Sequence, residues 1–580
     1  MSNTVSHRPL PIGVEFFHDM IERGYYYIDK TLLIKDIIDN MAQVTLFTRP
    51  RRFGKTLNMT MLKSFFEDTS ILHKTSYESE NTRQLFDNLN IANTGEKYMS
   101  EQGKYPVIFL TLKSAKQPDF ESSFSALRTL IASEFSRHSY VFDSLNDDEK
   151  EKYKLLSSGK GTTNDYKISL MFLSGCLYKY HNKKVIILID EYDVPLETSY
   201  FTGFYQEMIA FIRSLFESAL KTNIYLHFAV LTGCLRISKE SIFTGLNNLN
   251  IVSILSKKYD EYFGFTQKEV DEMFKFYKLE DKLEEAKRWY NGYMFGNANV
   301  YNPWSIIKIT DEWDTDKKTL PIAFWATTSS NAIVKSLIEK MDYEQNRQTK
   351  REIEQLISGN TMQKVIHEDI TYDEIDNSID NIWNFLYFTG YLTKVEERAD
   401  ENNNIVAELK IPNIEVSTIF RNKIQLWFET RIKAKDLKPF YEAILNGDAE
   451  KFEEILNDEL FDSISYFDNA ESFYHGFMLG LLRGATEYIL QSNRESGLGR
   501  CDIIMKFETP RGKAVIFEFK LAKKMNQLES LSVEALNQIE DKKYIADLID
   551  EGYKQEKIFK YGIAFCGKVC VVKGGNINYS

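Results

Sequence analysis

One stretch near the N-terminus constrains the fold more than any other part of the chain. Between Thr45 and Thr56, an apolar segment is followed by a basic loop and then by a Gly-Lys-Thr sequence that opens a helical pattern. A strand, a loop and a helix in this order form a phosphate-binding loop, or P-loop. Gly54 lets the backbone approach a phosphate, Lys55 can reach the β- and γ-phosphates, and the Thr56 hydroxyl can bind Mg²⁺. The motif is incomplete by itself, because Arg49 stands where the pattern has its first glycine.

A second segment supplies the acidic half of such a site. Residues 185–189 form a continuous apolar run, which is typical of a buried parallel strand, and the run ends in Asp190 and Glu191. Ligands of open α/β sheets bind at the carboxyl ends of the strands. We therefore expect Asp190 to hold the Mg²⁺ shell and Glu191 to orient the attacking water. The alternative is an ordinary strand end with two surface acids.

A third strand is predicted over residues 225–233, and it ends in the polar Thr232. We expect Thr232 to sense the γ-phosphate from this place. Arg236 follows directly and can meet phosphate, either in its own chain or from a neighbouring subunit; the alternative is a solvated surface cation. A homo-oligomer is therefore one of the arrangements that the sequence allows.

Together, residues 48–56, 188–193 and 231–239 resemble the AAA-ATPase-like family of bacterial proteins. That family carries an Arg-Pro-Arg-Arg type of run in place of the first P-loop glycine. The resemblance covers about residues 10 to 250 and implies a parallel-sheet P-loop domain that binds ATP and Mg²⁺. The implied nucleotide ligands are Arg52, Phe53, Gly54, Lys55, Thr56, Asp190, Thr232 and Arg236, with Mg²⁺ at Thr56 and Asp190. Whether the arginines of the loop hold the phosphates or point away from them stays open.

The residues before the P-loop allow two interpretations. One predicts an edge strand and a helix that pack on the core, with the helix near residues 32–41. The other places residues 11–17 near the base of the nucleotide.

Beyond residue 250, the pattern becomes helical and polar, and it predicts a helical lid over the nucleotide in residues 251–345. Residues 346–462 contain helical patterns and then two strands, at 390–395 and 405–411, around a polar turn. Helices followed by a hairpin resemble a winged helix. The acidic residues of the hairpin disfavour phosphate contact, so we expect a structural role for this region.

A second group of polar residues lies in residues 463–580. Asp502 begins an apolar strand, and Glu518 and Lys520 are two residues apart on the next strand, so their side chains leave the same face. A hairpin of the two strands can bring Asp502 and Glu518 together. Two carboxylates suit Mg²⁺ or Mn²⁺, which can polarise a phosphodiester and acidify a water. Lys520 can orient that water or stabilise the developing charge.

These residues resemble the PD-(D/E)XK nuclease superfamily over about residues 465 to 575. The resemblance implies an α/β restriction-endonuclease-like fold that acts on nucleic acid, with DNA favoured, and with Asp502, Glu518 and Lys520 as its catalytic core. It also implies a further acid on the preceding helix, for which Glu471 is the candidate, and Gln538 on the later helix. The alternative is a buried ion pair between Glu518 and Lys520 in an inactive fold, which would make the protein a nucleotide switch with an interaction module.

Composition agrees with a multidomain α/β protein. A chain of 580 residues exceeds one core, and we expect four domains, at 1–250, 251–345, 346–462 and 463–580. The net charge of −12 argues against a coat of positive charge for non-specific nucleic-acid binding. Five scattered cysteines indicate a reducing, cytoplasmic setting. No apolar run reaches membrane-spanning length and the N-terminus lacks a secretory pattern, so we expect no membrane partner.

Overall fold

The computed structural model divides the chain into two compact units, Met1–Ile333 with Thr361–Ile419, and Val334–Asn360 with Phe420–Ser580. The residues that the structure describes are 7–70, 82–235, 248–327, 352, 355–357, 359–368, 372–374, 378–420, 437–463, 471–483, 485, 487–496, 499–542 and 544–576. The two units divide the chain differently from the four ranges expected above. Within the described residues, no helix combines the length and the apolar character needed to cross a membrane.

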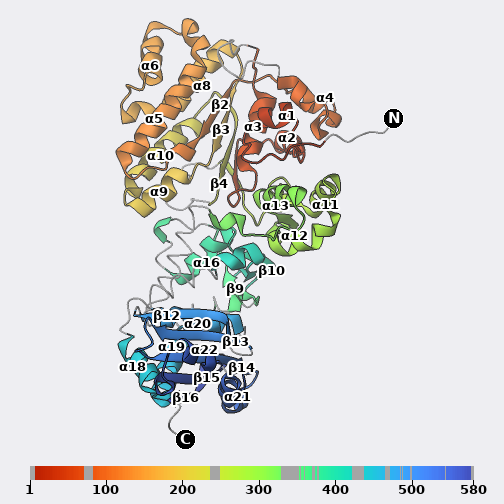
Figure 1. Ribbon diagram of the computed structural model, residues 1–580. Coiled ribbons are helices and arrows are strands. Elements are labelled where there is room, and N and C mark those ends of the chain that lie inside the picture. The colour runs from red at the N-terminus through yellow and green to blue at the C-terminus, as the bar shows by residue number, and fades with distance from the viewer. Residues whose placement is uncertain are drawn as a thin grey trace, which may run out of the picture. The chain divides into compact units, whose positions relative to one another are not determined.

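The first unit is built on a five-stranded parallel sheet (Figure 1). Its strands run in the order β2-β3-β4-β1-β5. Their bounds are Val44–Thr48 for β1, Val107–Thr111 for β2, Val185–Asp190 for β3, Leu226–Gly233 for β4 and Leu249–Val252 for β5. The expected α/β class with a parallel P-loop sheet is confirmed. Strand β5 was not expected from the sequence; it is a half-buried edge strand of only four residues.

Helices cover both faces of this sheet. Figure 1 shows α3 on one side of the strands and α5, α8 and α10 on the other. Their bounds are Lys55–Phe66, Phe120–Arg137, Ser169–His181 and Tyr205–Leu220. The smaller helices are α1 Phe17–Glu22, α2 Leu32–Asn40, α4 Glu96–Met99, α6 Asp147–Ser157, α7 Thr163–Lys167 and α9 Val194–Thr202. Because both faces are covered, the central strands β1 and β3 are buried along their whole length.

The segment before the P-loop differs from one expectation. Among the described residues 7–43, no strand forms, so the predicted edge strand is wrong, whereas the helix predicted near residues 32–41 is present as α2. Residues 11–16 are irregular and lead into α1, whose Phe17 amide donates a hydrogen bond to the Thr60 hydroxyl of α3 at 3.1 Å. This contact fixes the segment beside the P-loop helix.

The expected lid region contains helices and a small sheet. Its helices are α11 Gln267–Phe276, α12 Leu283–Tyr290 and α13 Pro303–Thr315. Three short strands, β6 Phe265–Thr266, β7 Tyr293–Phe295 and β8 Ala298–Tyr301, form an antiparallel sheet in the order β6-β8-β7. An apolar core that includes Tyr290, Tyr301 and Trp313 joins these elements.

The hairpin expected in the middle of the chain is present. Strands β10 Thr393–Ala399 and β11 Ile405–Lys410 pair antiparallel, after helix α16 Ile379–Phe388. A third strand, β9 Met362–Val365, adds to β11 and was not expected.

The second unit contains a mixed five-stranded sheet in sequence order, β12 to β16. The strands are Tyr488–Ser496, Gly499–Phe507, Ala514–Leu521, Ile558–Cys566 and Val569–Asn576. Helices α18 Lys438–Asn446, α19 Ala449–Ser463 and α20 Glu471–Leu482 share one apolar core with the sheet. Helices α21 Leu528–Asp541 and α22 Ile545–Asp550 share another with Ile504 and Ile516. Alternating residues of the strands thus face the two layers of helices.

Candidate functional site

The P-loop connects β1 to α3 and directs its lysine back into the loop. Gly54 is the residue before the helix and has a left-handed backbone (φ 81°), which glycine adopts without strain. Lys55 is buried, and its amine donates hydrogen bonds to the carbonyl oxygens of Arg49 at 3.0 Å and Pro50 at 3.1 Å. Burial disfavours the charged amine and so lowers the pKa of Lys55. The electrostatic effect of the surrounding groups, with Cys234 and Glu191 foremost, is larger in sum and raises this pKa above its ordinary value.

Asp190 is the centre of the polar edge of the sheet. One carboxylate oxygen accepts hydrogen bonds from the hydroxyls of Thr56 at 2.9 Å and Thr111 at 3.2 Å, and the other accepts from Thr232 at 2.7 Å. These partners come from α3, β2 and β4. Burial and then the charge of Glu191 raise the pKa of Asp190 above its ordinary value. The expected residues Thr56, Asp190 and Thr232 therefore form one contiguous group.

Two further acids lie on the turn after β3. Glu191 has a positive φ of 54°, and its carboxylate lies 3.5 Å from the Lys55 amine. Asp193 is buried, and one of its carboxylate oxygens accepts the amides of Cys234 at 2.7 Å and Leu235 at 3.1 Å. Burial and the neighbouring Glu191 raise the pKa of Asp193 to about 7. Asp193 thus ties the end of β4 to the start of α9.

The donor set at this edge fits a magnesium ion. Asp190 and Thr56 offer a carboxylate and a hydroxyl, which are the hard oxygen ligands that Mg²⁺ prefers, and they already lie within hydrogen-bond distance. Asp190 is buried beside the acidic Glu191, so a cation there would offset unfavourable charge.

The arginines of the loop contact protein groups. Arg49 is fully buried and donates hydrogen bonds to the carbonyl oxygens of Thr48 and Val252, both at 2.9 Å. Arg51 pairs with Glu197. Arg52 has a φ of 67°, and its guanidinium lies 4.5 Å from the ring centre of Trp304 and donates to the Phe324 carbonyl at 3.2 Å. Arg49 therefore faces the protein interior, whereas Arg51 and Arg52 border the cleft described next.

A cleft of about 540 Å³ opens in front of the P-loop. Its polar end is lined by the loop, by Glu191 and by Lys113. Apolar groups, including Val14, Phe265 and Ile307, line the rest, together with aromatic rings from α13 and from the segment after α1. The N-terminal segment contributes Pro11, Gly13, Val14 and Glu15 to this wall, and its place beside the nucleotide base stays a prediction. The Phe53 ring is buried against Tyr293 and Phe295, so only its backbone is available to a ligand.

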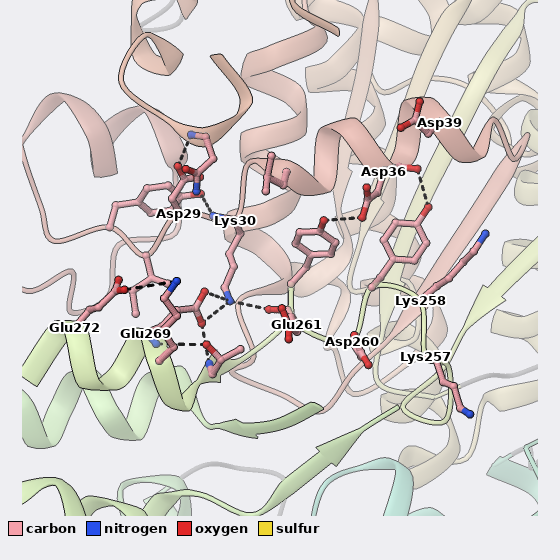
Figure 2. A pocket seen from close by; sticks show the side chains of 18 of the residues that line it. Asp29, Lys30, Asp36, Asp39, Lys257, Lys258, Asp260, Glu261, Glu269 and Glu272 are labelled. Atoms are coloured by element: carbon pink, nitrogen blue, oxygen red, sulfur yellow. Dashed lines mark hydrogen bonds and ion pairs between the residues drawn. The ribbon is translucent and has the colours of Figure 1, made fainter. Parts of the chain in front are cut away.

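A second cavity of about 860 Å³ shares Lys30 with the cleft as a lining residue (Figure 2). Figure 2 shows the Lys30 amine between Glu269 and Glu261; it lies 2.6 Å from the Glu269 carboxylate and 2.7 Å from the Glu261 carbonyl oxygen. Asp36 also has a protein partner, because it accepts the Tyr262 hydroxyl at 2.6 Å. Lys30 and Asp36 of this cavity thus each have a protein partner.

The second unit brings its expected acidic residues together. Ile503 of β13 pairs with Phe517 of β14, so Asp502 and Glu518 face each other across the next position. The Asp502 amide lies 3.4 Å from the Glu518 carboxylate, and the Asp502 carboxylate accepts the Phe519 amide at 2.8 Å. From α21, Gln538 donates to Glu518 and accepts from the Lys520 amine at 2.6 Å. Asp502, Glu518, Lys520 and Gln538 thus form one hydrogen-bonded group.

The same group offers oxygen ligands for a divalent metal. Glu518 is nearly buried, with 3% of its surface exposed, and the partly exposed Asp502 adjoins it. Among the side chains that the structure describes, no set of three or more His, Cys, Asp or Glu is arranged to hold a metal. The side chain of Glu471 lies outside the described residues, although its backbone begins α20 as expected. One turn later on α20, the His475 ring contacts the Asp502 carbonyl oxygen at 3.0 Å.

Two residues of the first site were not expected from the sequence, and one expected residue lies outside the part of the chain that the structure describes. Thr111 and Lys113 reach the site from the end of β2, which the sequence marks only as an apolar strand. Strand order could have revealed them, but strand order cannot be read from one sequence. Arg236, and all residues from 236 to 247, lie outside the described part of the chain.

Comparisons with known proteins match two separate ranges of the chain. Residues 11–243 match the family model described as "Predicted AAA-ATPase", and residues 469–574 match that of the PD-(D/E)XK nuclease superfamily. The chain is also 23% identical over 558 residues to a protein of Azotobacter chroococcum mcd 1 named for its position in the vnfD 5′ region, with 93% of each chain covered. These matches support nucleotide binding and a nuclease-like domain. The chain therefore combines an N-terminal AAA-ATPase-like domain with a C-terminal domain of the PD-(D/E)XK nuclease superfamily.

Proposed function

We propose that the first unit binds and hydrolyses ATP with Mg²⁺, and that the second unit is a Mg²⁺- or Mn²⁺-dependent nuclease that acts on DNA. The observation that carries the ATPase proposal is the position of Asp190, bound to Thr56 and Thr232 beside Lys55 and Glu191. The nuclease proposal rests on the hydrogen-bonded group of Asp502, Glu518, Lys520 and Gln538.

In the first unit, each residue has a distinct task. The Lys55 amine leaves the two loop carbonyls and binds the β- and γ-phosphates, while the amides at the start of α3 hold the phosphate oxygens. Thr56 and Asp190 would hold Mg²⁺, which neutralises phosphate charge when bound. Glu191 orients the water that attacks the γ-phosphorus, and Thr232 keeps the Asp190 carboxylate in place.

In the second unit, the protein orients a water against a phosphodiester. Asp502 and Glu518 would hold the divalent metal, which acidifies a bound water. Gln538 fixes Glu518 and Lys520 relative to each other through its amide group. The Lys520 amine then lies where it can stabilise charge on the phosphate.

The test is a cleavage assay on linear and circular DNA with Mg²⁺ or Mn²⁺, with and without ATP, alongside an assay of phosphate release. Asp502→Asn and Lys520→Ala should abolish cleavage and leave phosphate release intact. Lys55→Ala should abolish ATP binding. Asp541→Asn, an exposed acid at the end of α21, is the matched control and should cleave normally. DNA that stays intact in every condition would contradict the nuclease proposal.

A second function is favoured by one observation. Both carboxylates of the nuclease-like site already have protein partners, because Asp502 accepts the Phe519 amide and Glu518 accepts from Gln538. A nucleotide-driven switch with an inert nuclease-like module would tolerate this arrangement. It predicts ATP binding and ATP-dependent assembly without cleavage, and Asp502→Asn would then leave every measured property unchanged.

A further inference from the structure

The end of β2 brings one more cation into the P-loop cleft. Lys113 lies on the 3₁₀ turn Leu112–Ala115, directly after β2. Strand β2 is the immediate neighbour of β3, with Thr111 in register with Asp190. Because the carboxyl ends of parallel strands lie at one edge of the sheet, Lys113 emerges beside Glu191, and both residues line the cleft with Lys55 and Thr56.

The partner of Lys113 is a group that a phosphate can replace. The Lys113 amine lies 2.9 Å from both carboxylate oxygens of Glu15, which belongs to the N-terminal segment of the same cleft. Both side chains are exposed, 37% for Lys113 and 55% for Glu15. Exposed ion pairs of this kind are weak, and the γ-phosphate carries more negative charge than one carboxylate.

The two loop arginines that line the cleft with Lys113 already contact other protein groups. Within the described residues, the loop cations Arg51 and Arg52 are bound to Glu197 and to Trp304 and Phe324.

We propose that Lys113 is a further catalytic residue of the ATPase site, which leaves Glu15 and contacts the γ-phosphoryl group during hydrolysis. It would supply, within one chain, the cation that other phosphoryl-transfer enzymes take from an arginine finger. The inference rests on the proposed ATPase function. In the step, the water oxygen bonds to the γ-phosphorus and its proton passes to Glu191. The bond from the γ-phosphorus to the bridging oxygen breaks, and its electron pair stays on ADP. Lys113 forms no covalent bond and offsets charge on the γ-phosphoryl oxygens.

The test compares Lys113→Met with wild type in the full-length protein. Methionine keeps an unbranched, flexible side chain and removes the charge, so kcat should fall about 10²-fold or more, as when one transition-state donor is removed. Affinity for a non-hydrolysable ATP analogue should change little, whereas affinity for ADP with aluminium fluoride, which mimics the transition state, should fall with kcat. Lys113→Arg should restore part of kcat, and Lys116→Ala, at the exposed residue directly after the same turn, is the matched control.

Glu15→Gln separates catalysis from a merely structural role. If Lys113 acts on phosphate, removing the competing carboxylate should raise kcat. A fall in kcat equal to that of Lys113→Met would overturn the inference, because the ion pair would then serve to hold the N-terminal segment. If the Lys113→Met protein hydrolyses ATP at the wild-type rate, the inference about Lys113 is overturned and the ATPase proposal is not. Absence of ATP hydrolysis by the wild type would overturn it together with the ATPase proposal.

Discussion

Arg49 gives the unusual P-loop its shape from inside the protein. Its guanidinium lies between the rings of Phe263 and Phe295, at 5.3 and 5.2 Å, and donates to backbone carbonyls of β1 and β5. A glycine at this position could make none of these contacts. The loop therefore keeps its path through a buried side chain instead of through a flexible backbone.

This arrangement predicts different effects for two arginines of the same loop. Arg49→Ala leaves buried carbonyls without donors and opens a cavity, so it should lower the free energy of unfolding of the first unit by about 3 kcal/mol or more. Arg52→Ala removes a half-exposed contact with Trp304 and should cost about 1 kcal/mol or less. Urea denaturation measures both changes. An Arg49→Ala protein that unfolds at the wild-type midpoint but loses ATP affinity would contradict the structural role.

At the scale of elements, the positions of strands could be predicted from the sequence better than which strands lie next to one another in a sheet. The strands Val44–Thr48 and Val185–Asp190 could be predicted because a short, mainly apolar run is typical of a buried strand in an α/β domain. The pair Asp502 and Glu518 could be predicted because one hairpin joins them. The presence of Thr111 and Lys113 at the site could not be predicted, since their approach to Asp190 depends on β2 lying next to β3. The burial of Arg49 depends likewise on β5, whose Val252 carbonyl it binds.

One buried carboxyl joins three elements of the first unit. Glu415, which follows β11, accepts the Ser305 hydroxyl of α13 at 2.9 Å and the Trp325 amide at 2.9 Å. Burial raises its pKa from 4.5 to about 7, although the hydrogen bonds oppose this. The folded protein thus holds the Glu415 proton more tightly than the unfolded chain does.

Glu415 should therefore make the first unit less stable as the pH rises. Its contribution to the free energy of unfolding is fully present below pH 4.5 and is lost as the pH rises through about 7. A pKa change of this size corresponds to roughly 3 kcal/mol. Glu415→Gln, which cannot ionise, should flatten the dependence between these pH values in denaturant titrations. An unchanged pH profile in the variant would show that other groups cause the dependence.

At the scale of the whole molecule, the ligands proposed above belong to separate units. A ligand that binds one folded unit stabilises that unit by mass action, by about 2.7 kcal/mol at a hundredfold excess over Kd. We expect calorimetry to resolve two transitions, one raised by ATP with Mg²⁺ and the other by Mn²⁺ alone. Lys55→Ala should remove the first effect and Asp502→Asn the second. A single transition that moves with either ligand would mean that the units unfold together.

The enclosure of the P-loop has a consequence for synthesis on the ribosome. A side chain on Gly390 would place its Cβ 2.9 Å from Pro50, and Arg52 reaches the Phe324 carbonyl. The cleft also needs Phe265 and Trp304 for its walls. A nascent chain that has emerged only as far as β4 holds Lys55, Asp190 and Thr232 but lacks these covering residues. The order of translation thus delays the complete cleft until the chain beyond Ile307 is made.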